Sequence, residues 1–227
     1  MDFAAIRTQS TATAHGAGFS FATWLPPSDS AEVRPKDEIL DRWAALALLF
    51  CYVVAPEHVA STDDIEAFVD RHGLRSSLTE DERAILDLPR TDAADGYRDT
   101  IGWKLENMIP LAWALGRGPE PSIDGHMIQE VNDLVFTPFP EDPTAFDRGA
   151  FSLRPAQEIC QLEDLFYCVH NAVRCAQVTP PDQVPEGGFV PVGFNPLVNG
   201  GVIHERRHAL TWMLSPGVAW DATDLST

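Results

Sequence analysis

Residues 37–55 read DEILDRWAALALLFCYVVA. The segment begins with acidic residues, which are favoured in the first turn of a helix because the helix dipole is positive there. It then becomes apolar on nearly every face, which is the pattern of a helix surrounded by other helices. The apolar run at 43–55 is shorter than the roughly 20 residues of a membrane span. The segment therefore predicts a buried helix at the centre of a helical core.

Signals for helix ends recur along the rest of the chain. Ser, Thr and Asp precede apolar periodic segments, Thr79 with Glu82 forms a capping box, and Gly73 and Gly116 follow such segments. Pro110 is expected to kink the helix that contains it. The signals predict helices at about 37–55, 61–72, 79–86, 94–115, 124–135, 155–177 and 201–214. With no strand alternation and no internal repeat, the predicted class is all-α, a single globular domain of about six helices.

The segments between and before these helices differ in composition. Residues 1–36 are rich in Ala, Thr, Ser, Gly and Pro, and predict an irregular N-terminal arm that docks through Phe19, Phe21 and Trp24. The helical domain is then expected to cover residues 37–227. Pro-rich loops are predicted at 138–143 and 179–196, with a short extended piece at 189–192.

The chain is strongly acidic, with 16 Lys and Arg against 34 Asp and Glu and a formal net charge of −18. Such a charge repels phosphate backbones and anionic lipids, so nucleic-acid and membrane-surface binding are disfavoured. It attracts basic proteins. We therefore expect no nucleic acid and no membrane among the partners, and a basic protein as the partner class.

Four cysteines, Cys51, Cys160, Cys168 and Cys175, form no C-x-x-C pair. If the last two share a helix, they lie about 10 Å apart along its axis, beyond disulfide reach. The first residues contain no apolar stretch of signal-peptide length. These features predict reduced cysteines and a cytoplasmic location.

Charged residues interrupt several predicted apolar faces. Arg206 falls within the apolar stripe of the helix at 201–214, where a guanidinium needs a carboxylate partner or an open face. Glu106 lies in an aromatic stripe on the helix at 94–115. We expect a polar cluster formed by Trp103, Glu106, Trp113, Tyr167, His170, Arg174, Glu205, Arg206, His208 and Trp212. A buried structural network, a ligand pocket and a catalytic site all remain open as interpretations.

The sequence 204–208, His-Glu-Arg-Arg-His, is a literal H-E-x-x-H motif. On a helix it places His204 and His208 one turn apart, where they suit zinc, with Glu205 as general base. Both intervening residues are arginine, whose charge opposes a nearby dication. The motif defines one low-ranked alternative, a zinc-dependent hydrolase; otherwise no metal and no cofactor is expected.

Several motifs together resemble a known family. They are Arg42 in the first apolar helix, W-x-x-E-x6-W-A-L-G at 103–116, E-D-L-x-Y-x-x-H-x-x-x-R at 163–174, V-I-x-E-R-x-H-A-L-x-W at 202–212, and Trp220-Asp221. On these residues the chain resembles the bacterial family called domain of unknown function 4272. The resemblance implies a helical fold and no established activity. It also implies that Glu205 and Arg206 belong to the family pattern and His204 does not.

Three functional hypotheses follow. The first is a non-enzymatic cytoplasmic binding module that neutralises a basic partner, in the manner of immunity proteins. The second is a small-ligand or regulatory module that binds a carboxylate or phosphate near Trp103, Glu106, His170 and Arg174. The third is the zinc-dependent hydrolase. The sequence does not determine the oligomeric state.

Overall fold

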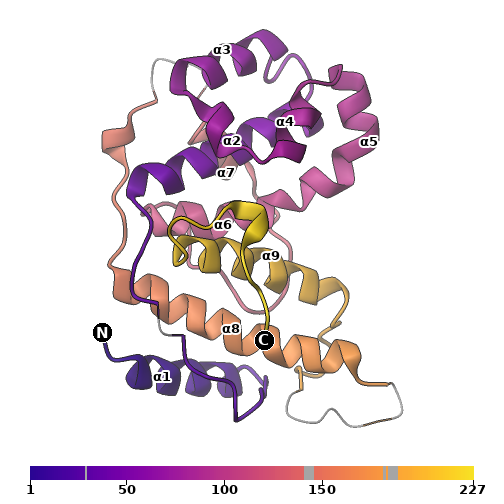
Figure 1. Cartoon of the computed structure of the whole chain (residues 1–227). Coiled ribbons are helices and arrows are strands. Elements are labelled where there is room, and N and C mark those ends of the chain that lie inside the picture. Colours follow the sequence, from indigo (N-terminus) through magenta and orange to yellow (C-terminus); the bar gives the residue numbers. More distant parts are fainter. Residues whose placement is uncertain (29, 141–145, 181–182, 184–188) are drawn as a thin grey trace. The chain divides into compact units, whose positions relative to one another are not determined.

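The computed structural model describes residues 1–28, 30–140, 146–180, 183 and 189–227 (Figure 1). Within these residues the fold is all-α, as predicted, with nine α-helices instead of about six and no strand beyond an isolated bridge between Ser20 and Phe189. The chain groups into two compact units. The first unit comprises residues 1–33, 121–127 and 154–227, and the second comprises residues 34–120 and 128–153.

The second unit is built around α2 (Lys36–Val54), which confirms the predicted core helix. Thirteen of its 19 residues are buried. The helices packed on it are α3 (Thr62–His72), α4 (Glu80–Leu86), α5 (Arg90–Gly102), α6 (Lys104–Ala114) and α7 (Asn132–Phe136), together with the 3₁₀ turn η1 (Leu74–Ser77). A helix that is apolar on all sides is stable in water only when neighbours cover it in this way.

Side chains close the ends of these helices. Ser61 accepts a hydrogen bond from the Asp64 amide at the start of α3, and Gly73 ends α3 with φ +66°. Thr79 and Glu82 form the predicted capping box of α4. A cap satisfies amide or carbonyl groups that lack a partner within the helix. The local signals at α3 and α4 therefore predicted both ends correctly.

A buried ion pair joins α4 to α2. The Arg42 guanidinium donates to both carboxylate oxygens of Glu82, at 2.6 and 2.7 Å, and to the Ser77 carbonyl at 2.8 Å. Burial raises the pKa of Glu82, but the Arg42 charge and the hydrogen bonds from Arg42 and the Thr79 amide together outweigh it, and the pKa falls below its ordinary value. Glu82 therefore stays ionised, and one side chain both caps α4 and fixes it to α2.

The helix predicted at 94–115 is two helices. The chain breaks at Trp103, which ends α5 and precedes α6, whereas Pro110 lies inside α6. Gly102 precedes the break, and glycine weakens a helix because it loses the most backbone freedom on ordering. The prediction of one continuous helix over 94–115 was therefore wrong. Tyr97 of α5 is 39% exposed.

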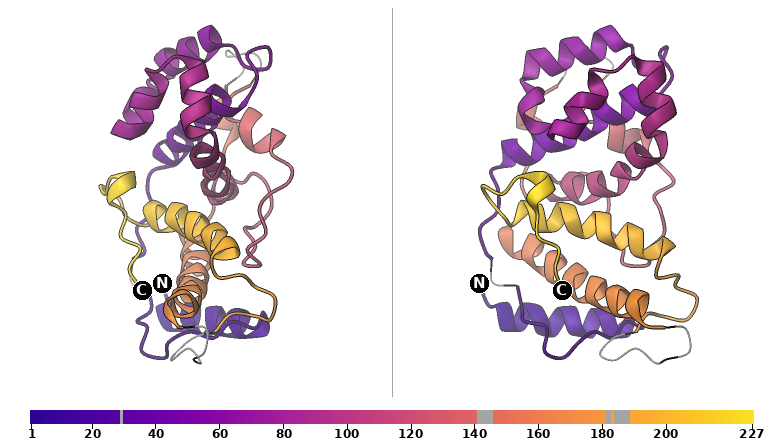
Figure 2. Two further views of the ribbon diagram at one scale, coloured as in Figure 1. Left: turned by 90° about the vertical axis from the view of Figure 1, so that its right-hand side faces the viewer. Right: turned by 45° about the vertical axis from the view of Figure 1, so that its right-hand side comes forward.

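The first unit consists mainly of three helices, with α8 (Ala156–Val178) lying between α1 (Phe3–Gly16) and α9 (Val198–Met213) (Figure 2). Two of these match predicted helices. The predicted apolar face of α8 is buried, including Ile159, Phe166 and Val173. The first unit is thus a small three-helix core with loops on its surface.

The prediction of an irregular arm at 1–36 was wrong for residues 3–16, which form α1. Asp2 caps this helix by accepting from the Ala5 amide. Ile6, Ser10 and Ala14 are buried at four-residue spacing, a pattern masked by the small and polar composition. Gln161 of α8 donates to the Ser10 hydroxyl at 3.0 Å.

The helix predicted at 124–135 was also mostly wrong, because only α7 at its end is helical. Gly125 lies in a turn with φ +73°, and a Cβ there would lie 2.5 Å from the Asn199 Cβ. Only glycine fits such a close approach. The predicted loops at 138–143 and 179–196 fall partly outside the described residues; Phe189 pairs with Ser20 through two backbone hydrogen bonds of 2.9 Å.

The sequence also predicted the state of the cysteines and the absence of a membrane span. The four cysteines are free, as predicted, and Cys51, Cys160 and Cys168 are buried. Burial raises the pKa of both Cys51 and Cys168 to about 12, so their thiols are protonated. Among the described helices, none has the length and apolar character to cross a membrane.

Removing one partner of the Arg42–Glu82 pair should be strongly destabilising. Arg42→Met leaves the Glu82 carboxylate buried without its cation, so we expect the free energy of unfolding to fall by about 3–5 kcal/mol in urea titrations. The double variant Arg42→Met/Glu82→Leu should recover part of this loss, because no charge is then left unpaired.

Arg75→Met is the control for the loss of an arginine in the same unit. The Arg75 side chain is 52% exposed and pairs with Asp87 at 3.4 Å, so its loss should cost under about 1 kcal/mol. A double variant no more stable than Arg42→Met would contradict the ion-pair interpretation.

Candidate functional site

A polar cluster with a buried centre lies between α8 and α9 in the first unit, and we call it the α8/α9 cluster: Glu163, Tyr167, His170, His204 and Arg207. Arg207 donates to Nδ1 of His170 at 2.5 Å, so the His170 proton is assigned to Nε2, which faces Nδ1 of His204 at 3.5 Å. Burial, then the charge of Arg207, lower the pKa of His170 to about 2. His170 is therefore neutral and links a buried arginine to an exposed histidine.

The Arg207 guanidinium is surrounded on several sides. It donates to the carbonyl oxygens of Leu225 at 2.9 Å and Ser226 at 3.2 Å, and its carbon lies 4.7 Å from the centre of the Tyr167 ring. Burial lowers the pKa of Arg207, and the Glu163 charge acts in the opposite direction. The charge is held by carbonyl dipoles, an aromatic face and a nearby carboxylate.

Two adjacent carboxylates of α8 face two arginines. Asp164 is fully buried and accepts hydrogen bonds from Arg7 of α1, the shortest at 2.7 Å. Glu163 accepts from the Thr211 hydroxyl at 3.1 Å. Burial raises the pKa of Glu163 above its ordinary value, although the Arg207 charge acts in the opposite direction. The Arg7–Asp164 ion pair and the Thr211–Glu163 hydrogen bond fix the packing of α1, α8 and α9.

Arg206 occupies a different side of α9. It is buried and donates to the carbonyl oxygens of Ser122 at 2.5 Å and His126 at 2.7 Å. The sequence predicted that this guanidinium needs a partner, and the structure provides backbone carbonyls of the loop 121–127 among its partners. Arg206 therefore holds this loop on α9.

The two histidines of the H-E-x-x-H motif have separate surroundings. His208 Nε2 lies 2.8 Å from the Trp220 carbonyl, to which it must donate, and its ring lies 4.4 Å from the Trp220 ring. His204 is exposed and faces His170. Within the described part of the chain, no three His, Cys, Asp or Glu side chains are grouped so that they could hold a metal ion. This geometry offers no support for the zinc-dependent hydrolase.

The other predicted site residues are dispersed. Arg174 is exposed and donates to Gln177 at 2.6 Å, and Glu205 is half-buried. Trp212 is buried against Trp220, with ring centres 5.2 Å apart. Trp103, Glu106 and Trp113 belong to the second unit. There Trp113 is buried, Trp103 is partly exposed, and the fully buried Glu106 accepts a hydrogen bond from the Ile128 amide at 2.9 Å.

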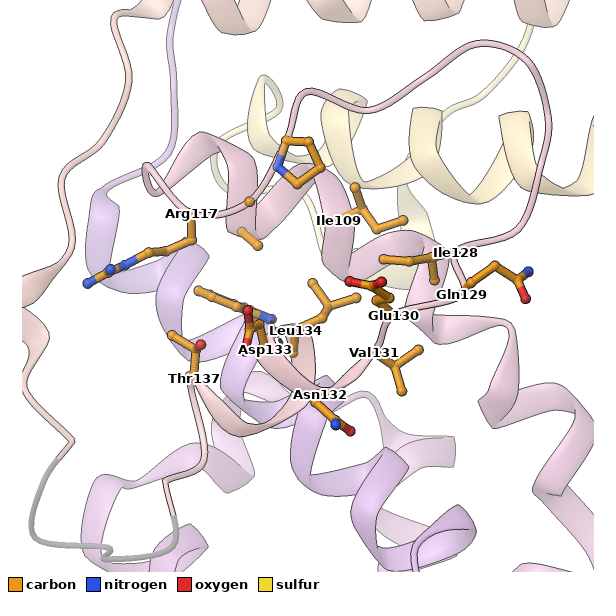
Figure 3. A pocket seen from close by; sticks show the side chains of 14 residues that line it. Ile109, Arg117, Ile128, Gln129, Glu130, Val131, Asn132, Asp133, Leu134 and Thr137 are labelled. Atoms are coloured by element: carbon orange, nitrogen blue, oxygen red, sulfur yellow. Dashed lines mark hydrogen bonds between the residues drawn. The ribbon is translucent and has the colours of Figure 1, made fainter.

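A cavity of about 840 Å³ lies in the second unit beside α6 (Figure 3). Two buried side chains hold its walls: Glu106 through the Ile128 amide, and Trp43 through a 2.9 Å hydrogen bond to the Leu134 carbonyl. Its apolar lining consists of Trp43, Ile109, Ala112, Pro119, Ile128, Val131 and Leu134. Its volume falls in the range of small-molecule sites.

The second unit also carries an acidic surface, which we define as the exposed acidic side chains of α3, α4 and α5: Asp63, Asp64, Glu66, Asp70, Glu80, Asp81, Asp92, Asp95 and Asp99. Residues 57–99 contain twelve acidic and five basic side chains. Helix α5 buries only Ala93 and Ile101 of its 13 residues. Most of α5 is thus exposed.

A family model described as domain of unknown function (DUF4272) matches residues 7–223. The chain belongs to this family. The resemblance predicted from its motifs is confirmed, and the DUF4272 match spans helices of both units. No curated protein and no solved structure matches the chain.

Sequence reasoning missed Arg7, Glu163, Asp164 and Arg207 of this DUF4272 protein as site residues. Arg207 lies one turn after the buried Ile203 and three residues before Leu210, so it shares the buried side of α9. Glu163 likewise follows Ile159 by one turn. These spacings were available in the sequence. The partner of Arg7 was not, since Asp164 lies 157 residues away.

Neutral, buried His170 should make stability depend on pH. The unfolded chain gains a proton below about pH 6.5, while folded His170 does not until about pH 2, so its stabilising contribution is complete above pH 6.5 and declines as pH falls. Relative to His170→Asn, whose amide oxygen can accept from Arg207 without titrating, the native protein should lose about 1 kcal/mol per pH unit between pH 6 and pH 4.

The measurement is the free energy of unfolding in urea at each pH. His58→Asn is the control, because His58 is exposed and an exposed imidazole has similar surroundings in both states. Its profile should run parallel to that of the native protein. Parallel profiles for the native protein and His170→Asn would refute the assignment.

The motif histidines should act as structural groups and not as metal ligands. His208→Ala removes the hydrogen bond to Trp220 and should lower stability by about 1 kcal/mol, whereas exposed His204 should matter less. Dialysis against a chelator should leave the Tm of the DUF4272 protein unchanged. About one zinc per chain by elemental analysis, with a Tm that falls on chelation, would restore the metal hypothesis.

Proposed function

We propose that this protein is a non-enzymatic, cytoplasmic binding module that captures a basic protein partner, in the manner of immunity proteins. The observation that carries the proposal is the exposure of α5. Asp95, Tyr97 and Asp99 are all exposed on this helix, which contributes only two side chains to the core. A 13-residue helix with so little buried surface is available for contact with another molecule.

The charge distribution supports a basic partner. The acidic surface repels anionic partners and accelerates encounter with a positively charged protein, most strongly at low salt. Tyr97 adds an aromatic ring between carboxylates, and tyrosine is enriched among the residues that dominate binding energy. A Lys or Arg of the partner could pair with an aspartate while its stem or charge contacts the ring.

The small-ligand hypothesis centred on Trp103, Glu106, His170 and Arg174 has less support. Because His170 is neutral, its imidazole supplies no positive charge to a carboxylate or phosphate. Arg174 is engaged by Gln177, and the carboxyl group of Glu106 supplies no positive charge. An anionic ligand therefore gains little from these groups, and the acidic surface is the better candidate.

Charge reversal on α5 should abolish partner capture. We expect tagged native protein to retain a stoichiometric basic protein from its native lysate at low salt and to release it in high salt. Asp95→Lys/Asp99→Lys should fail to retain that protein, as identified by mass spectrometry. The expected reason is the loss of attraction and the introduction of like-charge repulsion at the contact.

The control variant is Glu32→Lys/Asp221→Lys, which makes the same change in net charge at exposed positions of the first unit. It should retain the partner. Equal loss of capture by both variants would mean that net charge alone is responsible, and retention by the α5 variant, or no stoichiometric basic protein at all, would overturn the proposal.

A further inference from the structure

The cavity beside α6 is separate from the exposed surface of α5 and has a chemical character of its own. Its apolar lining, formed mainly by side chains of α2, α6, α7 and residues 128–131, suits an aliphatic or aromatic body. Its charged lining residues are Arg117, Glu130 and Asp133. The directions of these three side chains decide which ligand charge the cavity favours.

The Arg117 charge is directed away from the cavity. Its guanidinium donates to the Ala150 carbonyl at 2.9 Å, and its carbon lies 5.2 Å from the centre of the Phe151 ring. Figure 3 shows this side chain turned outward, away from Glu130 and Asp133. An anionic ligand would therefore have to break existing contacts to reach this cation.

The two carboxylates remain available. Figure 3 shows Glu130 and Asp133 on the cavity side of the segment that carries them. Among the residues that the structure describes, neither carboxylate has a hydrogen-bond or ion-pair partner. Two unpaired carboxylates beside an apolar cavity attract a group that is cationic and donates hydrogen bonds, because charge-assisted hydrogen bonds are the strong ones.

We infer that this cavity binds an organic cation, an ammonium or guanidinium group on an apolar body, with the body over Ile109 and Leu134 and the cation between Glu130 and Asp133. The indole of Trp43 is fully buried behind this lining and donates to the Leu134 carbonyl, which fixes Leu134 at the cavity wall. The ligand class covers a free amphipathic amine and a Lys or Arg side chain presented by another protein. The site does not depend on the α5 surface.

The test compares three ligands of the same shape by isothermal titration calorimetry on the full chain: 4-phenylbutylamine, 4-phenylbutanol and 4-phenylbutyrate. The amine should bind about tenfold more tightly than the alcohol, because it alone makes charge-assisted hydrogen bonds, and the butyrate should bind least. Equal affinity of amine and alcohol, preference for the butyrate, or no saturable binding of any of the three would overturn the inference.

Isosteric variants locate the binding. Glu130→Gln/Asp133→Asn removes both charges at exposed positions and keeps the shape of each side chain, and it should abolish the preference for the amine. Glu32→Gln/Asp221→Asn makes the same charge change at exposed positions of the first unit and should leave the preference intact. Val131→Phe adds volume to the cavity lining without altering charge, and it should weaken the binding of all three ligands. An unchanged preference in Glu130→Gln/Asp133→Asn would overturn the inference.

A capped peptide, acetyl-Gly-Leu-Lys-Leu-Gly-amide, distinguishes the two sources of the cation. Binding of the peptide that is at least as tight as that of 4-phenylbutylamine, and is lost in Glu130→Gln/Asp133→Asn, would identify a basic side chain of a partner as the occupant. Binding of the amine alone would identify a free amine. Since Asp95→Lys/Asp99→Lys leaves this cavity unaltered, failure of partner capture and failure of amine binding are independent outcomes.

Discussion

The loops of this all-α chain depend on guanidinium groups that bind backbone carbonyls. Loop carbonyls have no partner in a helix or strand, and leaving them buried without a donor is costly. Arg206 binds two carbonyls of the loop 121–127, Arg207 binds two of the segment 225–226, and Arg90 binds those of Cys51 and Ala55 at the end of α2. An arginine suits this task because its planar group has five donors in a fixed geometry. The same device thus closes a helix end and holds two loops.

The buried charges are balanced, whereas the charges of the whole chain are not. The chain has only 16 basic side chains against 34 acidic ones, and several of the arginines are directed inward, including Arg42, Arg206 and Arg207. Four acidic residues, Glu82, Glu106, Glu163 and Asp164, are buried among the described residues, as are four arginines, so burial removes equal numbers of each sign from the surface. The excess of acidic side chains in this part of the chain therefore lies among the less buried residues, most evidently on α3 to α5.

The sequence predicted the parts of the fold that rest on local chemistry. The buried run of α2, the capping box at Thr79 and the ends of α3 each depend on residues within a few positions. Helix α1 was missed because its buried side, Ile6, Ser10 and Ala14, is weakly apolar and gains its stability from contacts with α8, which are distant in the chain. The pattern of α9 was enough to recognise Arg206 as a buried charge that needs a partner. It could not identify the Ser122 and His126 carbonyls, because they lie 84 and 80 residues away in the chain. Likewise, the cavity is formed by segments whose proximity no motif encodes.

The two units differ in what they leave available to a ligand. In the α8/α9 cluster the strongest charges already face one another or face carbonyls, and His170 is held neutral, so a ligand would have to displace protein contacts to enter. In the second unit Arg42 is likewise paired with a partner inside the protein, Glu82. Helix α5, however, is mostly exposed, and the Glu130 and Asp133 carboxylates border an apolar cavity. A ligand binds more favourably to charged groups that have no partner within the protein, because no existing contact must be broken first. Recognition in this protein is therefore expected on the second unit, and the conspicuous H-E-x-x-H motif of the first unit belongs to the groups that hold the helices together.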